Sequence, residues 1–260
     1  MALAPRSSGP IAFSSNRSGT DEVYLANDDG SIVTPLTEGG TPAWSRDGRR
    51  LALVRRFDTY VIDRDGTNLR YVTAGVGPAW SPDGGALVVE SWVSPGDSEI
   101  SLVNVDGSNR RPLYSSGGYL AFGPAWSPDG RRVLLSVGTF IDFFTGLWEV
   151  NVDGSGERQL SDLFDAWDPA WSLDGSQIAF ATNAGIEVAQ ADGSGRRLLV
   201  PGAAREPDWT PDGRVVFVRP TSPDHGPRAP TALDLLRPSR RTSGMSFRDV
   251  RLLPRPAAVP

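Results

Sequence analysis

The heptapeptide Pro-Ala-Trp-Ser-Pro-Asp-Gly constrains this chain more than any other feature. It occurs unchanged at 78–84 and at 124–130, and near-copies occupy 42–48, 169–175 and 207–213. The five tryptophans of these copies are Trp44, Trp80, Trp126, Trp171 and Trp209, separated by 36, 46, 45 and 38 residues. A repeat with a period near forty residues predicts an architecture built from stacked copies of one small unit.

Each copy ends in a tight turn. Pro presets the backbone for the second turn position, Asp accepts hydrogen bonds from nearby amides, and Gly takes a positive φ. Asp83 and Gly84 hold these places in one unchanged copy, and Asp129 and Gly130 hold them in the other. Because a β-rich run follows every copy, the unit begins as a short strand, a turn and a strand. The repeated Trp is expected to pack one unit against the next.

A second turn signal lies out of phase with the first. Asp-Gly pairs occur at 29–30, 65–66, 106–107, 153–154 and 192–193, each between apolar or alternating runs. Two hairpins per period give four strands, which is the composition of one propeller blade. The sequence therefore predicts an all-β fold, a β-propeller of four-stranded antiparallel blades. Six second strands favour six blades, and five blades with a loose tail are the alternative.

Length and charge limit what the chain can do. With 260 residues it can form a single propeller domain, and it holds no apolar run long enough to span a membrane. The first ten residues lack the features of a signal peptide, and there is no cysteine. The net charge is −5, with the excess of acid before residue 219. An acidic body argues against nucleic acid as a partner, and we expect a monomer.

The two ends of the chain leave the ring closure open. Residues 219–260 are rich in Pro and Arg and predict an irregular sixth blade or a partly disordered tail, with candidate strands at 233–236 and 250–253. The inner strand of the first blade could come from Leu3-Ala4 or from 256–259. The residues do not decide between these two segments.

One run carries a resemblance to a known family. Residues 11–25 read Ile-Ala-Phe-Ser-Ser-Asn-Arg-Ser-Gly-Thr-Asp-Glu-Val-Tyr-Leu, followed by Asn-Asp-Asp-Gly-Ser at 27–31 and Pro-Leu-Thr at 35–37. With the Trp-Ser-Pro-Asp-Gly turn, this resembles the TolB-like propeller repeat, which is WD40-like and also called PD40. The resemblance extends to about residue 218. It implies a non-catalytic, partner-binding propeller in the bacterial periplasm or outside the cell.

The loops after the second and fourth strands form what we call the loop face. They are expected at 14–21, 38–41, 55–58, 74–77, 91–98, 115–123, 138–145, 161–168 and 201–206. Variable loops on a rigid scaffold are where binding residues concentrate. The candidate partner-binding residues are Arg55, Phe57, Trp92, Phe122, Phe143, Phe144, Trp167, Asp168, Arg205 and Glu206. The alternative for any one ring is that it folds back onto the propeller.

The residues that precede the inner strands are expected to surround the channel mouth. They are Thr41, Gly77, Gly123, Asp168 and Glu206. Two carboxylates from adjacent blades, those of Asp168 and Glu206, could hold a cation or help to bind a small ligand or glycan. The alternative is that both are ordinary solvated acids.

Catalytic signals are weak. The single histidine is His225, and no Gly-x-Ser-x-Gly nucleophile motif occurs. We therefore predict no catalytic residues, no metal site and no cofactor. The favoured function is a protein-interaction scaffold that uses the loop face. The alternatives are small-molecule, glycan or cation binding at the channel mouth, or an accessory propeller domain of a hydrolase or peptidase system.

Overall fold

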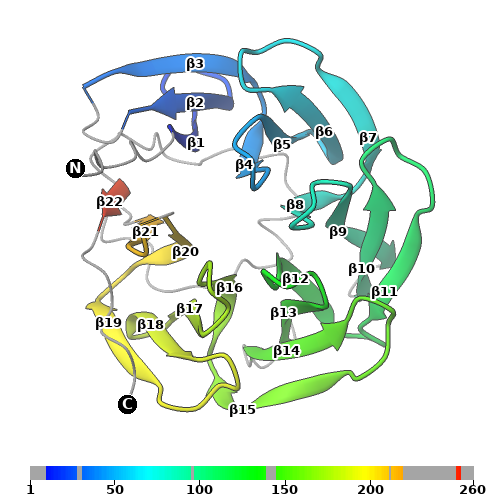
Figure 1. Cartoon of the computed structure of the whole chain (residues 1–260), viewed down its shortest axis with the longest axis vertical. Coiled ribbons are helices and arrows are strands. Elements are labelled where there is room, and N and C mark those ends of the chain that lie inside the picture. Colours follow the sequence, from blue (N-terminus) through cyan, green and yellow to red (C-terminus); the bar gives the residue numbers. More distant parts are fainter. Residues whose placement is uncertain are drawn as a thin grey trace, which may run out of the picture.

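The computed structural model describes residues 10–27, 31–94, 97–138, 145–210, 212–218 and 250–252. Within these ranges every regular element is a β-strand. The strands form six antiparallel sheets, which we number as blades 1 to 6 in chain order. Figure 1 shows them arranged in a ring, with the first strand of each of blades 2 to 6 towards its centre.

Blades 1 to 3 occupy the first half of the ring. Blade 1 contains β1 (Ile11–Ser15), β2 (Glu22–Ala26) and β3 (Val33–Glu38). Blade 2 contains β4 (Gly40–Trp44), β5 (Arg50–Arg55), β6 (Asp58–Asp63) and β7 (Arg70–Ala74). Blade 3 contains β8 (Val76–Trp80), β9 (Ala86–Ser94), β10 (Asp97–Asn104) and β11 (Arg111–Ser115).

Blades 4 to 6 occupy the second half. Blade 4 contains β12 (Leu120–Trp126), β13 (Arg132–Gly138), β14 (Thr145–Asn151) and β15 (Arg158–Phe164). Blade 5 contains β16 (Trp167–Trp171), β17 (Gln177–Thr182), β18 (Gly185–Gln190) and β19 (Arg197–Pro201). Blade 6 contains β20 (Arg205–Trp209), β21 (Val215–Val218) and β22 (Val250–Leu252).

The predicted all-β propeller with four-stranded antiparallel blades is confirmed. Blades 2 to 5 have four strands each, and blades 1 and 6 have three among the described residues. The candidate strand at 250–253 is present as β22, which pairs with β21 through Val216 and Leu252. The candidate strand at 233–236, and both candidates for the inner strand of blade 1, lie outside the described residues.

The first turn in each of blades 2 to 6 is held by one repeated set of hydrogen bonds. In blade 4 the Ser127 hydroxyl donates to Asp129 Oδ1 at 2.6 Å, and the Arg131 N–H donates to the same oxygen at 3.0 Å. The Arg132 N–H donates to Ser127 Oγ at 2.9 Å, and Gly130 has a φ of 74°. The same Ser-or-Thr to Asp bond recurs in the other turns, at Ser45–Asp47, Ser81–Asp83, Ser172–Asp174 and Thr210–Asp212. The motif is therefore a self-contained turn whose polar groups satisfy one another.

The repeated Trp packs against the preceding blade. Trp80 of blade 3 is buried in a cluster with Ala52, Val61 and Val72 of blade 2. Its indole N–H donates to the Ala43 carbonyl of β4 at 2.9 Å. Trp80 thus packs between two neighbouring blades, as the sequence predicted for the repeated Trp.

The area of the ring matters more at these positions than its N–H group. Trp209 repeats the bond of Trp80, because its N–H donates to the Ala170 carbonyl of blade 5 at 3.1 Å. The buried indole nitrogens of Trp44, Trp126 and Trp171 have no partner within the described ranges. A buried polar group without a partner costs about 1–3 kcal/mol. The apolar contact area of the rings must therefore outweigh this cost in three of the five copies.

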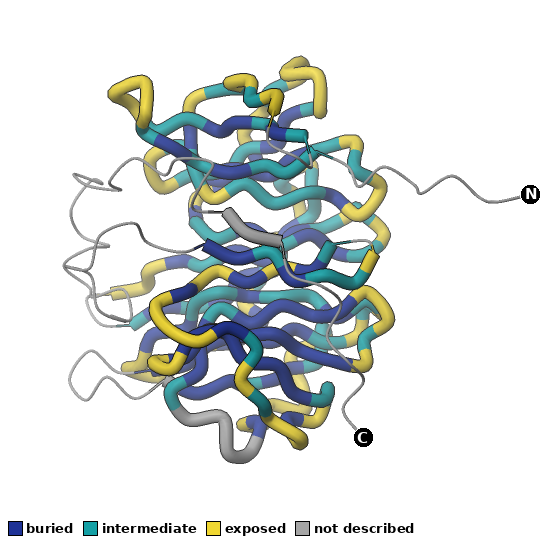
Figure 2. The backbone as a smooth tube through the Cα atoms, turned by 90° about the vertical axis from the view of Figure 1, so that its left-hand side faces the viewer, coloured by how far each residue is buried: buried dark blue, intermediate teal, exposed yellow. Residues whose placement is uncertain are grey.

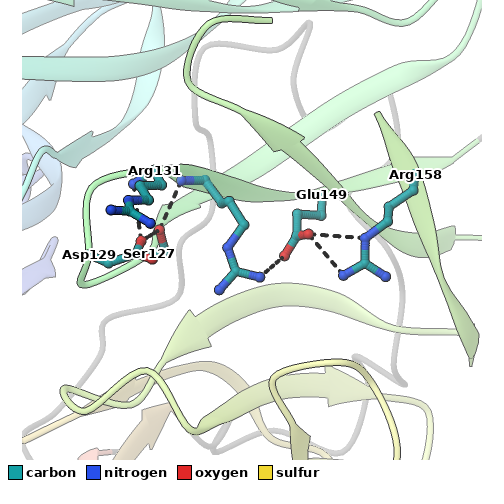
Figure 3. A network of polar contacts seen from close by, with 6 residues as sticks. Ser127, Asp129, Arg131, Glu149 and Arg158 are labelled. Carbon is teal, nitrogen blue, oxygen red and sulfur yellow. Dashed lines mark hydrogen bonds and ion pairs between the residues drawn. The ribbon is translucent and has the colours of Figure 1, made fainter. Parts of the chain in front are cut away.

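A charged cluster connects three strands of blade 4, β13, β14 and β15 (Figure 3). The carboxylate of Glu149 is buried, and it accepts bonds at 2.9 Å from both Arg132 Nη1 and Arg158 Nη2. The Arg132 guanidinium also lies over the ring of Trp171 in blade 5, 5.1 Å from its centroid. Arg50 occupies the same place over Trp80, at 4.8 Å. In blades 2 and 4, therefore, the Arg at the start of the second strand covers the Trp of the next blade.

Replacement of Trp80 by Ala tests the packing role of the repeated ring. We expect Trp80→Ala to lower the free energy of unfolding by about 3–5 kcal/mol, since it leaves a cavity between two blades. Trp92→Ala, at a ring with 40% of its surface exposed, should cost about 1 kcal/mol or less. Urea unfolding followed by circular dichroism measures both. Equal small losses would contradict the interpretation of Trp80 as core.

The turn aspartates predict an acid-dependent loss of stability. Hydrogen bonds from the Ser172 hydroxyl and from Ser176 lower the pKa of Asp174 to about 2. Since the folded state favours the ionised form, this carboxylate stabilises the fold above its ordinary pKa near 4 and stops doing so as pH falls through about 2. Asp174→Asn should lower the unfolding midpoint at pH 6, with a difference from the parent that shrinks towards pH 2. A constant difference across this range would contradict the assignment.

Candidate functional site at the loop face and channel mouth

The order of strands within a blade determines on which of the two faces of the propeller each connecting loop lies. Because each blade is an antiparallel meander, the loops after its second and fourth strands lie at the same end. Backbone bonds tie these loops together, from the Gly75 N–H to the Phe57 carbonyl at 2.8 Å and from the Gly202 N–H to the Ala184 carbonyl at 2.9 Å. Figure 2 shows exposed residues gathered at the two ends of the strands, with buried residues between them.

Four large apolar side chains are exposed at the loop face of blades 2 and 3. They are Phe57 (53% exposed), Trp92 (40%), Val93 (61%) and Tyr119 (49%). We call these four residues the aromatic patch. Phe57 lies between β5 and β6, Trp92 and Val93 lie near the end of β9, and Tyr119 precedes β12. The sequence predicted Phe57 and Trp92 as binding residues, whereas Val93 and Tyr119 were not among its candidates.

A chain of hydrogen bonds connects the two blades beneath this patch. The Phe57 carbonyl accepts from Gly75, which follows Ala74 in the chain. Arg110 Nη1 donates to the Ala74 carbonyl at 2.9 Å, and Arg110 Nη2 donates to Ser91 Oγ at 2.6 Å. Ser91 directly precedes Trp92. Phe57 and Trp92 are therefore held on neighbouring blades of the propeller.

The loop that carries Tyr119 is fixed to the start of β10. The Ser116 hydroxyl lies 2.8 Å from Asp97 Oδ1, and it also contacts the Tyr119 carbonyl. Ser98 Oγ accepts from the Ala121 N–H at 2.7 Å. Since Ser98 pairs with Trp92 across the hairpin, Tyr119 and Trp92 lie on adjoining loops.

Trp167 is not a surface residue, so its prediction as a binding anchor is wrong. The sequence placed it in a loop at 161–168, but β15 extends to Phe164 and β16 begins at Trp167. Its ring is 6% exposed and packs in a core cluster with Trp209 and Phe217 of blade 6. Phe122 is partly buried against the same cluster, so little of it can face a partner. Phe143 and Phe144 lie outside the described residues.

The two predicted arginines have different surroundings. Arg55 is tied to blade 1, because its Nε donates to the Glu38 carbonyl at 3.0 Å and a second nitrogen donates to the Thr37 hydroxyl. Arg205 is exposed, with Nε 3.9 Å from Glu206 Oε1. Arg55 therefore holds the loop face together, while Arg205 remains accessible next to an acid.

The five residues predicted at the channel mouth share one unusual conformation. Thr41, Gly77, Gly123, Asp168 and Glu206 have φ values of 44°, 57°, 58°, 50° and 51°. Each lies at a register shift between the first and second strands of its blade. Such a bulge bends the inner strand, and positive φ is strained for the three residues that are not Gly. The five residues that hold the same place in the repeated motif therefore also share the same backbone conformation.

Glu90 is a channel-mouth residue that the sequence analysis missed. It pairs with Val76 from the middle of β9, the second strand of blade 3, and Oε1 accepts from the Gly123 N–H of blade 4 at 2.8 Å. Ser136 is its counterpart in blade 4, and Ser136 Oγ accepts from the Asp168 N–H of blade 5 at 3.2 Å. A Cβ atom on Gly77 would lie 2.4 Å from Glu90 Oε1. The only signal in the sequence was a Glu at the end of an apolar strand.

The carboxylates at the mouth hold their protons unusually tightly. Burial raises the pKa of Glu90 to about 7, and Asp168 adds to the effect while the Gly123 N–H opposes it. Burial and then the charge of Glu206 raise the pKa of Asp168 to about 7. Desolvation also raises the pKa of Glu206, although solvent reaches 61% of that side chain and limits the effect. The carboxyls of Glu90 and Asp168 are therefore only partly ionised near neutral pH.

Two further features of the described residues bear on the alternatives. No group of three or more His, Cys, Asp or Glu side chains in the described ranges is placed to hold a metal ion. In the same ranges there is no helix long and apolar enough to cross a lipid bilayer.

The model of one protein family matches most of this chain. Residues 55–225 match the model of the TolB beta propeller domain, which is more than half of the chain. The chain belongs to the TolB β-propeller family. This confirms the resemblance inferred from the repeated turn and from residues 11–37.

Solved structures with the same fold include TolB proteins and an enzyme. TolB from Acinetobacter baumannii gives a TM-score of 0.68 at 18% identity, over 82% of this chain and 59% of that one. A putative TolB from Agrobacterium tumefaciens gives 0.65 at 22%, over 80% and 78%. An oligogalacturonate lyase from Vibrio parahaemolyticus gives 0.53 at 15%, over 81% and 83%. At these identities the likeness shows the fold alone, and a comparison with curated proteins gives no match.

The channel-mouth acids of this TolB-family propeller predict a pH-dependent stability. A carboxyl whose folded pKa is raised to about 7 makes the native state bind more protons than the unfolded chain between about pH 4 and pH 7. Stability from this source is therefore present at low pH and lost as pH rises through that window. Glu90→Gln should raise the thermal midpoint at pH 8 and have little effect at pH 5.

Differential scanning calorimetry of the parent and the variant at several pH values measures this effect. Glu38→Gln provides the control, because Glu38 is an exposed acid on the same face. A Glu90→Gln variant that is destabilised equally at every pH would contradict the prediction.

Proposed function

We propose that this chain is a non-catalytic scaffold that binds another protein, and that the partner docks on the loop face over blades 2 and 3. The observation that carries the proposal is the aromatic patch. Four large apolar side chains are exposed on adjoining loops, and three of them are aromatic. Aromatic rings supply much of the binding energy at protein interfaces, because they cover a large area at a small cost in conformational entropy.

The rigidity of the underlying hairpin supports the proposal. Trp92 and Val93 belong to β9, and the pairing of β9 with β10 continues through Trp92 with Ser98 and through Ser94 with Asp97. A ring on a paired strand loses little freedom on binding. The TolB relatives supply the family context, while the lyase among the structural neighbours shows that the fold also carries enzymes.

The channel mouth favours a second candidate, the binding of a small ligand. The charge of Asp168 acts on Glu90, and the pKa values of both carboxyls are raised. We place this second, because each of these acids already has a structural partner or role at the blade junctions. Exposed ring area, in contrast, has no use within the described part of the fold.

Affinity capture from a lysate of the source organism tests the proposal. We expect the wild type to enrich a protein that the double variant Phe57→Ser, Trp92→Ser fails to capture, with a loss of at least about tenfold. Mass spectrometry identifies and quantifies the captured protein. Circular dichroism melting of each variant confirms that it is folded.

The matched control is the double variant Tyr71→Ser, Leu198→Ser. These side chains are 54% and 48% exposed, but they lie on the outer strands β7 and β19 rather than on the loop face. The control should capture the same protein as the wild type. Equal capture by the Phe57, Trp92 variant, or no specific capture by any form, would overturn the proposed function.

A further inference from the structure

We propose that the partner presents a basic segment, in which Lys or Arg stands next to apolar side chains, and that this segment binds across Trp92, Tyr119 and the carboxylate of Glu90. The inference rests on the proposed function and adds the chemistry of the partner. It combines two independent features of one place on the loop face. One feature is exposed aromatic area, and the other is negative charge without a positive partner.

Strand geometry places Trp92 and Glu90 on the same side of β9. Residues two apart on a strand point to the same side, and the pairing of β9 with β10 is regular from Glu90 to Trp92. Glu90 faces blade 4, because it accepts the Gly123 N–H. Ser91 points the opposite way, because it accepts a bond from the Arg110 guanidinium, which also donates to the Ala74 carbonyl of blade 2. The ring of Trp92 therefore leaves the strand on the side that carries the carboxylate.

Further acids continue from Glu90 around the mouth. Gly123 adjoins Asp168, whose Oδ1 would lie 3.4 Å from a Cβ atom on Gly123. The charge of Asp168 acts on Glu90, and the charge of Glu206 acts on Asp168. None of the ion pairs within the described residues involves Glu90 or Asp168. In the described part of the chain, Arg205 is the one cation whose charge acts on Asp168. The ionised fraction of these carboxyls therefore carries negative charge that no ion pair of the described residues takes up.

The arginines of the same face do not reverse this charge. Arg55 is bonded to the backbone of blade 1, and Arg205 lies beside Glu206. Arg56 is exposed next to Phe57 in blade 2, whereas Glu90 and Trp92 belong to β9 of blade 3. The part of the patch on β9 therefore has a carboxyl group two residues from its aromatic ring.

Charge complementarity selects the partner. A cation gains from the face of an aromatic ring by about 0.5–2 kcal/mol and gains further from a nearby carboxylate. An acidic segment would meet repulsion from Glu90, Asp168 and Glu206. Apolar side chains beside the cation would cover Val93 and Phe57, which are the most exposed members of the patch.

Selection from random dodecapeptides displayed on phage tests the inference while the partner is still unidentified. The folded wild-type chain is the bait, and Trp92→Ser is used for counterselection. We expect the enriched peptides to carry Lys or Arg adjacent to apolar residues. Selection of acidic or uncharged peptides, or no enrichment that depends on Trp92, would overturn the inference.

Isothermal titration of an enriched peptide measures the role of each group. Trp92→Ser should weaken binding by at least about tenfold. Glu90→Gln keeps an oxygen for the Gly123 N–H but removes the charge, and it should weaken binding by about threefold to tenfold. Tyr71→Ser, on the outer strand β7, should leave affinity unchanged. An unchanged affinity in Glu90→Gln would overturn the role of charge.

The two proposals fail in distinguishable ways. If a protein is captured through Phe57 and Trp92 while the selected peptides are acidic or neutral, the scaffold function stands and the basic partner is rejected. If the patch variant captures as well as the wild type, the proposed function itself fails.

Discussion

The packing of one tryptophan against the preceding blade is the interaction on which the rest of the structure depends. A four-stranded sheet cannot bury both of its faces alone, so each blade is stable only between two neighbours. Trp80 shows how the contact is made, with its ring among apolar residues of blade 2 and its N–H on the backbone of β4. Because the ring belongs to the inner strand, the same contact sets the spacing of blades around the channel.

The turns and the bulge that flank this strand convert a repeated sequence into a uniform scaffold. At one end, the Ser-to-Asp bond closes the first turn within the motif itself. At the other end, Gly77, Gly123 and their counterparts bend the strand through a positive φ. In blades 4 and 5 the N–H at this position, that of Gly123 or Asp168, donates to the preceding blade. Both ends are therefore fixed by local bonds, which leaves the remaining loops free to vary.

The sequence predicted the fold well because the fold is local and repeated. The Trp, the turn Asp and the turn Gly each have one physical role. Because the motif occurs five times, it can be recognised even where one copy differs, as at Arg46, which replaces the second Pro. The candidate site was predicted less well because exposure depends on where a strand ends. Trp167 and Trp92 both looked like loop tryptophans, yet β16 begins at Trp167 and buries it, while β9 carries Trp92 beyond the core.

Glu90 was missed for a related reason, since its role depends on a residue in another blade. Pattern alone shows a Glu after Val88 and Val89, which is typical of a strand that reaches solvent. Only the assembled ring brings its carboxylate to the Gly123 N–H and near Asp168. The long hairpin of blade 3 thus holds a half-buried carboxylate and an exposed ring two residues apart. A scaffold with uniform blades gains specificity where one strand runs on past its neighbours, because that extension is both rigid and unique.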